Sequence, residues 1–500
     1  MTGARGARVA ALHLMLVLAG CEVTAPGVGD DAGAGFDAAR PDAAQDGALG
    51  DGGAPWDAHL VDAASDDASL DAALPPLEEG ELLPGGDTTT SVVDGSAFLQ
   101  QAANLTIARR ADFEAGLQFF RLEWEIAPGR PEADGLGPVY NAVSCIECHV
   151  RNGRGAPSAT PDENRPGVLL RLGTPDGRPD PTYGDQLQPL GVPGVAGEGH
   201  ARRFESLVSH RLADGTQAML PLPRYDIASL GYGPLAGGAV LSPRIAQQLV
   251  GQGLLEAIDE DDLLALADEL DADADGISGR VRWIDALRIG RFGWKAGQPT
   301  VEEQTSAAFA GDLGITSSVH PTEACTESQA ACLGAASGGS PELTATRLRV
   351  ASSYVRLLGV PARRDAEAPS VRRGRVLFAA VGCDGCHRPS FVTGDSVEPE
   401  LAGQRIWPYT DLLLHDMGER LADGRAEGDA SGREWRTAPL WGIGLLGVVG
   451  GEVRLLHDGR ARGVAEAVLW HDGEATAARL GFESLTELER ADLVSFVESL

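Results

Sequence analysis

The chain has 500 residues and a formal net charge of −32. This length suffices for two or three domains. The acidic balance excludes nucleic acid as a partner, because negative charge repels the phosphate backbone.

The N-terminus has the pattern of an export signal. An apolar run over 9–19 is too short to span a membrane and is typical of a signal peptide. It ends in Leu-Ala-Gly-Cys, which resembles a bacterial lipobox and predicts a signal peptide over 1–20 with lipidation of Cys21. An ordinary secretory signal with an incidental cysteine is the alternative. We expect the protein on the periplasmic side of a bacterial membrane, and Glu22 favours the outer membrane.

Residues 21–95 are rich in Ala, Asp and Gly, and contain 17 acidic residues and one basic residue. They carry half of the net charge of the chain. Such a segment cannot bury enough apolar surface to offset the entropy of ordering it. We predict a disordered tether that holds a globular body away from the membrane.

Two C-x-x-C-H motifs predict covalently bound haem, one at 145–149 and one at 383–387. Thiols three residues apart project from one side of a helical turn and can reach two substituents of a porphyrin, with the next residue under the iron. A redox dithiol would need no histidine, and a zinc site would need further ligands nearby. We predict two haem c groups, held by Cys145, Cys148, His149, Cys383, Cys386 and His387.

A helix over about 97–125 precedes the first motif, and a long insertion follows it. Within the insertion, Glu256 stands in an apolar run, where desolvation would raise the pKa of its carboxyl group into a range useful for acid catalysis. We predict that Glu256 is the catalytic acid at the first haem. A helix-surface glutamate is the alternative.

Three aspartates alternate before a glycine: Asp271, Asp273 and Asp275. This spacing is typical of the first half of a calcium-binding loop. The twelfth position is Arg282, so calcium would need ligands from elsewhere. A solvated acidic turn is the alternative.

Two cysteines remain in the insertion, Cys325 and Cys332. In an exported chain they most simply form a disulfide, and a redox centre is the alternative. Trp294 and Trp435 are candidates for aromatic side chains that help electrons cross between the haems, although buried tryptophans usually serve the core.

In the second half, an apolar helix pattern ends just before the motif. A capping box at 484–487 then predicts an amphipathic C-terminal helix. Of the four methionines, only Met417 follows the second motif. We predict that its thioether is the axial ligand opposite His387, and a core-filling methionine is the alternative.

Together with the first haem motif, several further motifs resemble those of the di-haem oxidoreductase family, whose members are also called thiol oxidoreductases. This family is similar in turn to bacterial di-haem cytochrome c peroxidases. The further motifs occur in the same order and are GLLEAI (253–258), DADADGISGR (271–280), GRFGWKA (290–296), PYTDLLLHDMG (408–418), WRTAPLWG (435–442) and LLHDGRA (455–461).

The resemblance implies a distal glutamate at Glu256 and leaves room for calcium near the haem interface. In related peroxidases the residue before a His-Asp-Gly turn can bind the second haem. Here that residue is Leu456, which cannot bind iron. The ligand must therefore come from Met417, His415 or His457, or the site is open.

The expected fold is mainly α, with two cytochrome c-like haem domains over 96–360 and 361–500, the first carrying the long insertions. The expected function is reduction of peroxide at the first haem, with electrons from a partner redox protein entering through the second. The alternative is a non-catalytic, membrane-tethered di-haem electron carrier.

Overall fold

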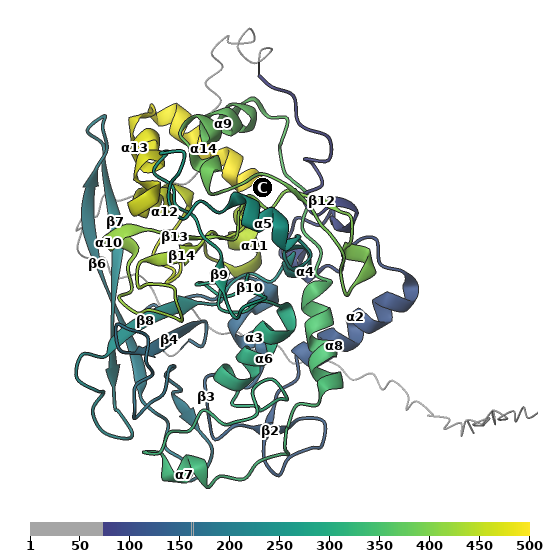
Figure 1. Cartoon of the computed structure of the whole chain (residues 1–500), viewed down its shortest axis with the longest axis vertical. Coiled ribbons are helices and arrows are strands. Elements are labelled where there is room, and N and C mark those ends of the chain that lie inside the picture. The colour runs from purple at the N-terminus through teal and green to yellow at the C-terminus, as the bar shows by residue number, and fades with distance from the viewer. Residues whose placement is uncertain (1–73, 162, 164) are drawn as a thin grey trace, which may run out of the picture. The chain divides into compact units, whose positions relative to one another are not determined.

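The computed structural model describes residues 74–161, 163 and 165–500 (Figure 1). The expected signal peptide, Cys21 and the tether before residue 74 lie outside the described residues. Within the described part of the chain, no helix is both long and apolar enough to cross a membrane.

The fold mixes helices with many short strands, so the expectation of a mainly α fold is wrong. Helices make up 30% of the described residues, and strands together with isolated β-bridges make up 18%. These strands pair two by two in seven separate sheets. The longest strands lie in the insertion after the first motif, whose structure the helical pattern around the two motifs did not reveal.

The longest sheet is a hairpin of β6 (His200–Arg211) and β7 (Gln217–Ala228), paired antiparallel along its whole length. Its turn contains Gly215, which has a φ of 89° that favours glycine. The hairpin runs along one edge of the described chain in Figure 1. Its tip reaches the C-terminal helices, where Asp214 pairs with Arg490 at 2.6 Å.

The remaining elements have the following bounds. The longer helices are α2 (Ile107–Phe120), α6 (Val301–Asp312), α8 (Ala345–Arg356), α9 (Pro369–Ala380), α13 (Thr476–Ser484) and α14 (Glu487–Ser499). The shorter ones are α3 (Cys145–Cys148), α4 (Gln252–Glu256), α5 (Glu260–Leu266), α7 (Ala330–Leu333), α10 (Gly418–Leu421), α11 (Leu446–Gly450) and α12 (Val464–Trp470). Single 3-10 turns are η1 (Gly86–Thr88), η2 (Ala97–Leu99), η3 (Val150–Asn152), η4 (Cys383–Gly385), η5 (Pro399–Leu401), η6 (Ile443–Leu445) and η7 (Gly473–Ala475). The other strands are β1 (Glu125–Ile126), β2 (Asp134–Leu136), β3 (Val139–Tyr140), β4 (Val168–Gly173), β5 (Leu190–Gly191), β8 (Val240–Ile245), β9 (Arg282–Trp283), β10 (Ile289–Gly290), β11 (Phe391–Val392), β12 (Arg405–Ile406), β13 (Leu414–Asp416) and β14 (Glu434–Arg436).

Each motif follows a helix that crosses a partner helix closely at a glycine. On α9, a Cβ at Gly374 would lie 1.9 Å from the Asp492 carbonyl oxygen of α14. On α2, a Cβ at Gly116 would lie 2.6 Å from the Cβ of Tyr354 on α8. Both helix pairs lie side by side in Figure 1. The C-terminal helix is capped by Thr486 and Glu489, two residues later than predicted, because Ser484 still belongs to α13.

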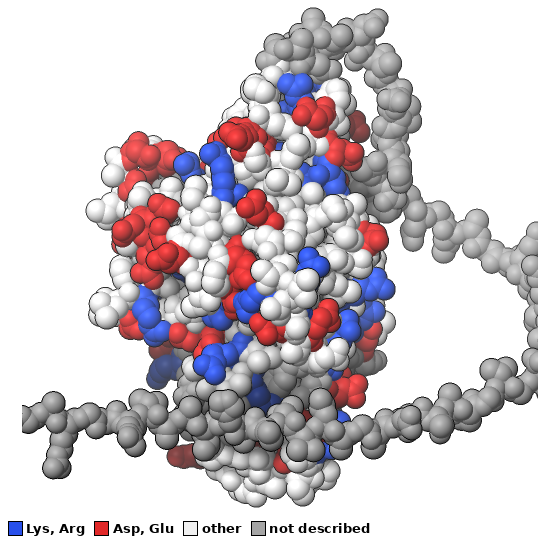
Figure 2. Space-filling view, turned by 90° about the vertical axis from the view of Figure 1, so that its right-hand side faces the viewer, with Lys and Arg blue, Asp and Glu red and all other residues white. Residues whose placement is uncertain are grey.

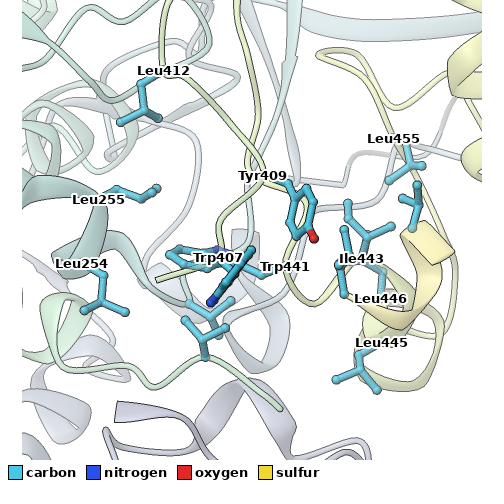
Figure 3. Packing of buried hydrophobic residues seen from close by; sticks show 14 of the residues in the cluster. Leu254, Leu255, Trp407, Tyr409, Leu412, Trp441, Ile443, Leu445, Leu446 and Leu455 are labelled. Atoms are coloured by element: carbon cyan, nitrogen blue, oxygen red, sulfur yellow. The ribbon is translucent and has the colours of Figure 1, made fainter. Parts of the chain in front are cut away.

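The main hydrophobic core takes residues from both sides of residue 360. It includes Phe98 and Leu254 from the first half and Trp407 and Trp441 from the second. Figure 3 shows the two tryptophans between Leu254 and Ile443. The two halves therefore share a core, and a boundary at residue 360 stays a prediction.

The described end of the expected tether packs against the body. Glu81 forms an ion pair with Arg363, and both side chains are fully buried. The backbone N–H of Thr90 donates to the Val360 carbonyl at 2.9 Å. On the face in Figure 2, acidic and basic side chains are interspersed.

Candidate functional site

A cavity of about 470 Å³ lies beside the second motif. Cys383, Cys386 and His387 line it, together with apolar side chains that include Phe378, Leu493 and Val497 from the helices α9 and α14. A cavity of this size with a mostly apolar lining and a few polar groups is typical of cofactor sites.

The imidazole of His387 is oriented for metal binding. Its Nδ1–H donates to the Tyr409 carbonyl at 2.9 Å, which leaves Nε2 without a proton. Burial lowers the pKa of His387 to about 4, so the ring is neutral. A neutral imidazole with a free Nε2 is the form that binds iron.

The first motif has the same arrangement. Cys145 and Cys148 stand at the two ends of α3, and His149 follows. The Nδ1–H of His149 donates to the Gln247 carbonyl at 2.8 Å, and burial lowers the pKa of His149 to about 4. In each half a phenylalanine lies near the motif histidine, with ring centroids 6.5 Å apart for Phe120 and His149 and 6.3 Å apart for Phe378 and His387.

The four motif thiols are not reactive dithiols. Burial raises the pKa of Cys145 and of Cys383 to about 12, and it also raises the pKa values of Cys148 and Cys386. A redox-active or metal-binding thiol needs a lowered pKa. Such thiols beside a neutral histidine instead fit the attachment of a haem, and at the second motif an apolar cavity adjoins them.

Three candidate ligands gather at the second cavity, where Met417, His457 and His471 all line the wall. The His457 ring stacks on Trp435 at 3.8 Å between centroids, and burial lowers its pKa to about 3. His471 donates from Nδ1 to the Ala467 carbonyl at 2.6 Å, as an axial histidine would. Leu456, in the left-handed region at a φ of 67°, also lines the cavity.

His415 is not available as a ligand. Its Nε2 lies 2.9 Å from Asp411 and its Nδ1 lies 2.8 Å from Glu474. Burial alone would lower the pKa of His415, but the two carboxylates hold it well above the usual range. A protonated imidazole with both nitrogens bonded cannot bind iron.

Glu256 lies at the C-terminal end of α4, and its role at the first haem stays a prediction. Its carboxylate pairs with Arg356 and accepts the Val301 N–H at 2.7 Å, at the start of α6. It lines a separate cavity of about 650 Å³. The 12 residues of α6 span about 18 Å. Asp312 is the last residue of this helix, so Glu256 and Asp312 lie at its opposite ends.

A different carboxyl group, that of Asp312, lies near the first motif at the end of α6. Burial raises the pKa of Asp312, and its charge contributes to the raised pKa values of Cys145 and Cys148. Gln186 donates to it at 2.8 Å. The sequence analysis missed Asp312. Its one local signal is an acidic residue at a helix C-terminus, where the helix dipole disfavours negative charge.

The aspartate loop and the remaining cysteines are where the sequence placed them. Carboxylate oxygens of Asp271, Asp273 and Asp275 lie within 4.8 Å of one another. They also accept hydrogen bonds from backbone N–H groups of the same turn. Calcium binding stays a prediction. Cys325 and Cys332 are joined in a disulfide.

Both candidate tryptophans line the second cavity. Trp294 donates from Nε1 to the Ile245 carbonyl at 2.8 Å. Arg244 and Lys295 each lie 4.4 Å from the Trp435 ring centroid. Arg154 lies 5.5 Å from the Trp294 ring centroid, so each of the two rings has a cation nearby, and a role in electron transfer stays a prediction.

A protein-family model described as "Di-haem oxidoreductase, putative peroxidase" matches residues 82–177 and 236–500. The matched ranges include both motifs and leave out the β6–β7 hairpin. No curated protein and no solved structure matches the chain.

Proposed function

The chain belongs to the di-haem oxidoreductase family, and from this premise we propose that it reduces hydrogen peroxide at the first haem with electrons that enter through the second. Each bound haem iron accepts and releases one electron. Two haems can therefore hold the two electrons that, with two protons, convert one hydrogen peroxide molecule into two water molecules.

The observation that carries this assignment is that the candidate axial ligands are unevenly distributed between the two motifs. Met417, His457 and His471 all line the second cavity. Of the other described histidines, His210 bonds to Glu483, His320 bonds to Ser306, and His200 lines neither cavity. A haem with both axial positions filled suits electron transfer, and a haem with one open position suits reaction with peroxide.

We propose that Met417, together with His387, would hold the iron of the second haem. It lines the cavity, and it immediately precedes α10 in a part of the chain anchored by the β13–β14 pair. The neighbouring His415 is already bound between two carboxylates. A thioether ligand raises the potential of this haem.

Asp312, rather than Glu256, is the proton donor that this proposal places at the first haem. Burial raises the pKa of Asp312, so its carboxyl group keeps a proton at higher pH than an exposed aspartate does. Glu256 is instead engaged in an ion pair with Arg356.

Electron paramagnetic resonance of the haem-loaded protein tests the assignment. We expect one low-spin signal and one high-spin signal, of which only the high-spin signal changes when peroxide is added. Met417→Ala should convert the low-spin signal to high spin, whereas Met219→Ala, on the exposed hairpin, should leave both signals unchanged. Two low-spin haems that do not respond to peroxide would instead identify an electron carrier.

We further propose that the haems are attached covalently, that the protein is exported and lipid-anchored at Cys21, and that a separate redox protein donates the electrons. The two thiols beside each axial histidine and the signal-like N-terminus support this. Labelling with a radioactive fatty acid should mark the wild-type protein and not the Cys21→Ser variant. Equal labelling of both would overturn the anchor.

A further inference from the structure

Two arginines in the wall of the second cavity are buried without a carboxylate partner. Arg154 follows the first motif and is 9% exposed, and Arg436 lies on β14 and is 5% exposed. Both line the cavity that contains Cys383 and His387. The cavity wall is thus shared between the two halves of the chain.

The guanidinium groups bond only to neutral groups. Arg154 donates to the Gln248 side chain at 2.7 Å and to the Arg454 carbonyl at 3.2 Å. Arg436 donates to two backbone carbonyls and, at 2.9 Å, to Oε1 of Gln247. Among the described residues, no carboxylate forms an ion pair with either arginine.

Most other buried arginines of the described chain have carboxylate partners; Arg291 is an exception that bonds to backbone carbonyls, and it lines neither cavity. Arg244 pairs with Asp423 at 2.7 Å, and Arg460 pairs with Asp458 at 2.8 Å. An unpaired buried charge is costly, so two of them that face one cavity favour an anion there. In line with this, burial and the charge of Arg436 lower the pKa of Arg154 to about 10.

We propose that Arg154 and Arg436 form a carboxylate-binding site that holds the propionate groups of the second haem. The inference rests on the family premise that the chain binds haem, and it does not depend on peroxide being the substrate. Haem carries two carboxylates, and the cavity that contains its attachment thiols contains two unpaired guanidinium groups. A third arginine of the lining, Arg479, is already paired with Glu483.

The midpoint potential of the second haem tests this site in the haem-loaded protein without peroxide. Arg154→Gln and Arg436→Gln should each lower this potential, because each removes a positive charge that favours uptake of an electron. Arg454→Gln is the matched control, since Arg454 pairs with Glu452 outside the cavity lining, and it should leave the potential unchanged. Unchanged potentials in both cavity variants would overturn the proposal.

If the glutamine variants do not retain haem, a variant that keeps the positive charge at residue 436 provides a second test. Arg436→Lys should then restore the haem content, and failure to restore it would count against the charge-based site.

Added acetate distinguishes the source of the carboxylate. If the haem's own propionates fill the site, acetate leaves the wild-type potential unchanged. An acetate-dependent shift that both glutamine variants abolish would show a site for a free anion and would overturn the assignment to propionates.

Discussion

At the scale of single residues, one backbone contact prepares each axial histidine. His149 and His387 both donate from Nδ1 to a carbonyl, of Gln247 and of Tyr409 respectively. That bond fixes the tautomer with a free Nε2, and burial keeps the ring neutral. The tautomer and the charge of both histidines are therefore set by residues outside the two motifs.

The two candidate acids, Asp312 and Glu256, lead to different predictions for their variants. Asp312→Asn should lower kcat/KM for peroxide about 100-fold, the typical contribution of a positioned proton donor. Glu256→Gln should change it only slightly, but should lower the free energy of unfolding by about 3 kcal/mol, because Arg356 loses its buried partner. Steady-state kinetics and denaturant unfolding of both variants check this. The reverse pattern would restore Glu256 as the acid.

Glu198 should make stability fall with rising pH. Burial raises its pKa from 4.5 to about 7. The folded state therefore holds a proton that the unfolded state has already lost, and stability falls as pH rises from 4.5 through about 7. The loss amounts to about 3 kcal/mol for a shift of this size. Denaturant unfolding at a series of pH values should show this slope in the wild type and not in Glu198→Gln. Parallel pH profiles would refute it.

Local sequence identified the two C-x-x-C-H motifs, but it carries no information on the surroundings of either candidate acid. The two thiols and the histidine of each motif lie within five residues, so the sequence spacing alone fixes their relative positions. The role of Glu256 depends on Arg356, which is 100 residues away in sequence. The environment of Asp312 depends on side chains such as Gln186, 126 residues away. Neither contact leaves a local pattern.

At the scale of elements, the close helix crossings repeat in the two halves. The α9–α14 crossing places Phe378 against Phe496, with ring centroids 5.2 Å apart, and the same Phe378 ring lies 6.3 Å from that of His387. The crossing at Gly374 therefore supports the axial histidine through one aromatic ring.

Gly374→Ala should separate this helix pair. The added Cβ would lie 1.9 Å from a backbone oxygen of Asp492, which cannot move as a flexible side chain does. We expect a loss of about 2 kcal/mol or more in the free energy of unfolding, as for other overpacked sites. Gly447→Ala is the control, because its nearest contact would be an ordinary 3.5 Å. Equal stability of the two variants, measured by thermal unfolding, would be inconsistent with the close crossing.

The helices around the motifs were predictable because their apolar residues and caps are local. The first helix nonetheless begins at Ile107, with Thr106 as its cap, rather than near residue 97. The hairpin was not predictable, because its strands alternate irregularly between buried and exposed positions and Pro221 and Pro223 interrupt the strand pattern. It also falls in the segment that the family model does not match.

At the scale of the whole molecule, one residue connects the two haem sites. The Gln247 carbonyl accepts from His149 of the first site, and its side chain accepts from Arg436 of the second cavity. Both bonds are shorter than 3 Å. A change at the second cavity can therefore alter the position of the first axial histidine.

Gln247→Leu should reveal this connection. The variant keeps the carbonyl that His149 needs and removes the contact with Arg436. We expect a shifted resonance signal of the first haem, and the same shift in Arg436→Gln. Gln252→Leu, in α4, should leave the signal unchanged. A first-haem signal that matches the wild type in both Gln247→Leu and Arg436→Gln would mean that the two sites are independent.

The intact mass of the mature protein, produced in a host that attaches haem c, tests the central claim most directly. The account predicts a mass increased by two haem groups in the wild type and by one in the Cys383→Ser/Cys386→Ser variant. A colourless protein, or a mass without added haem, would contradict it.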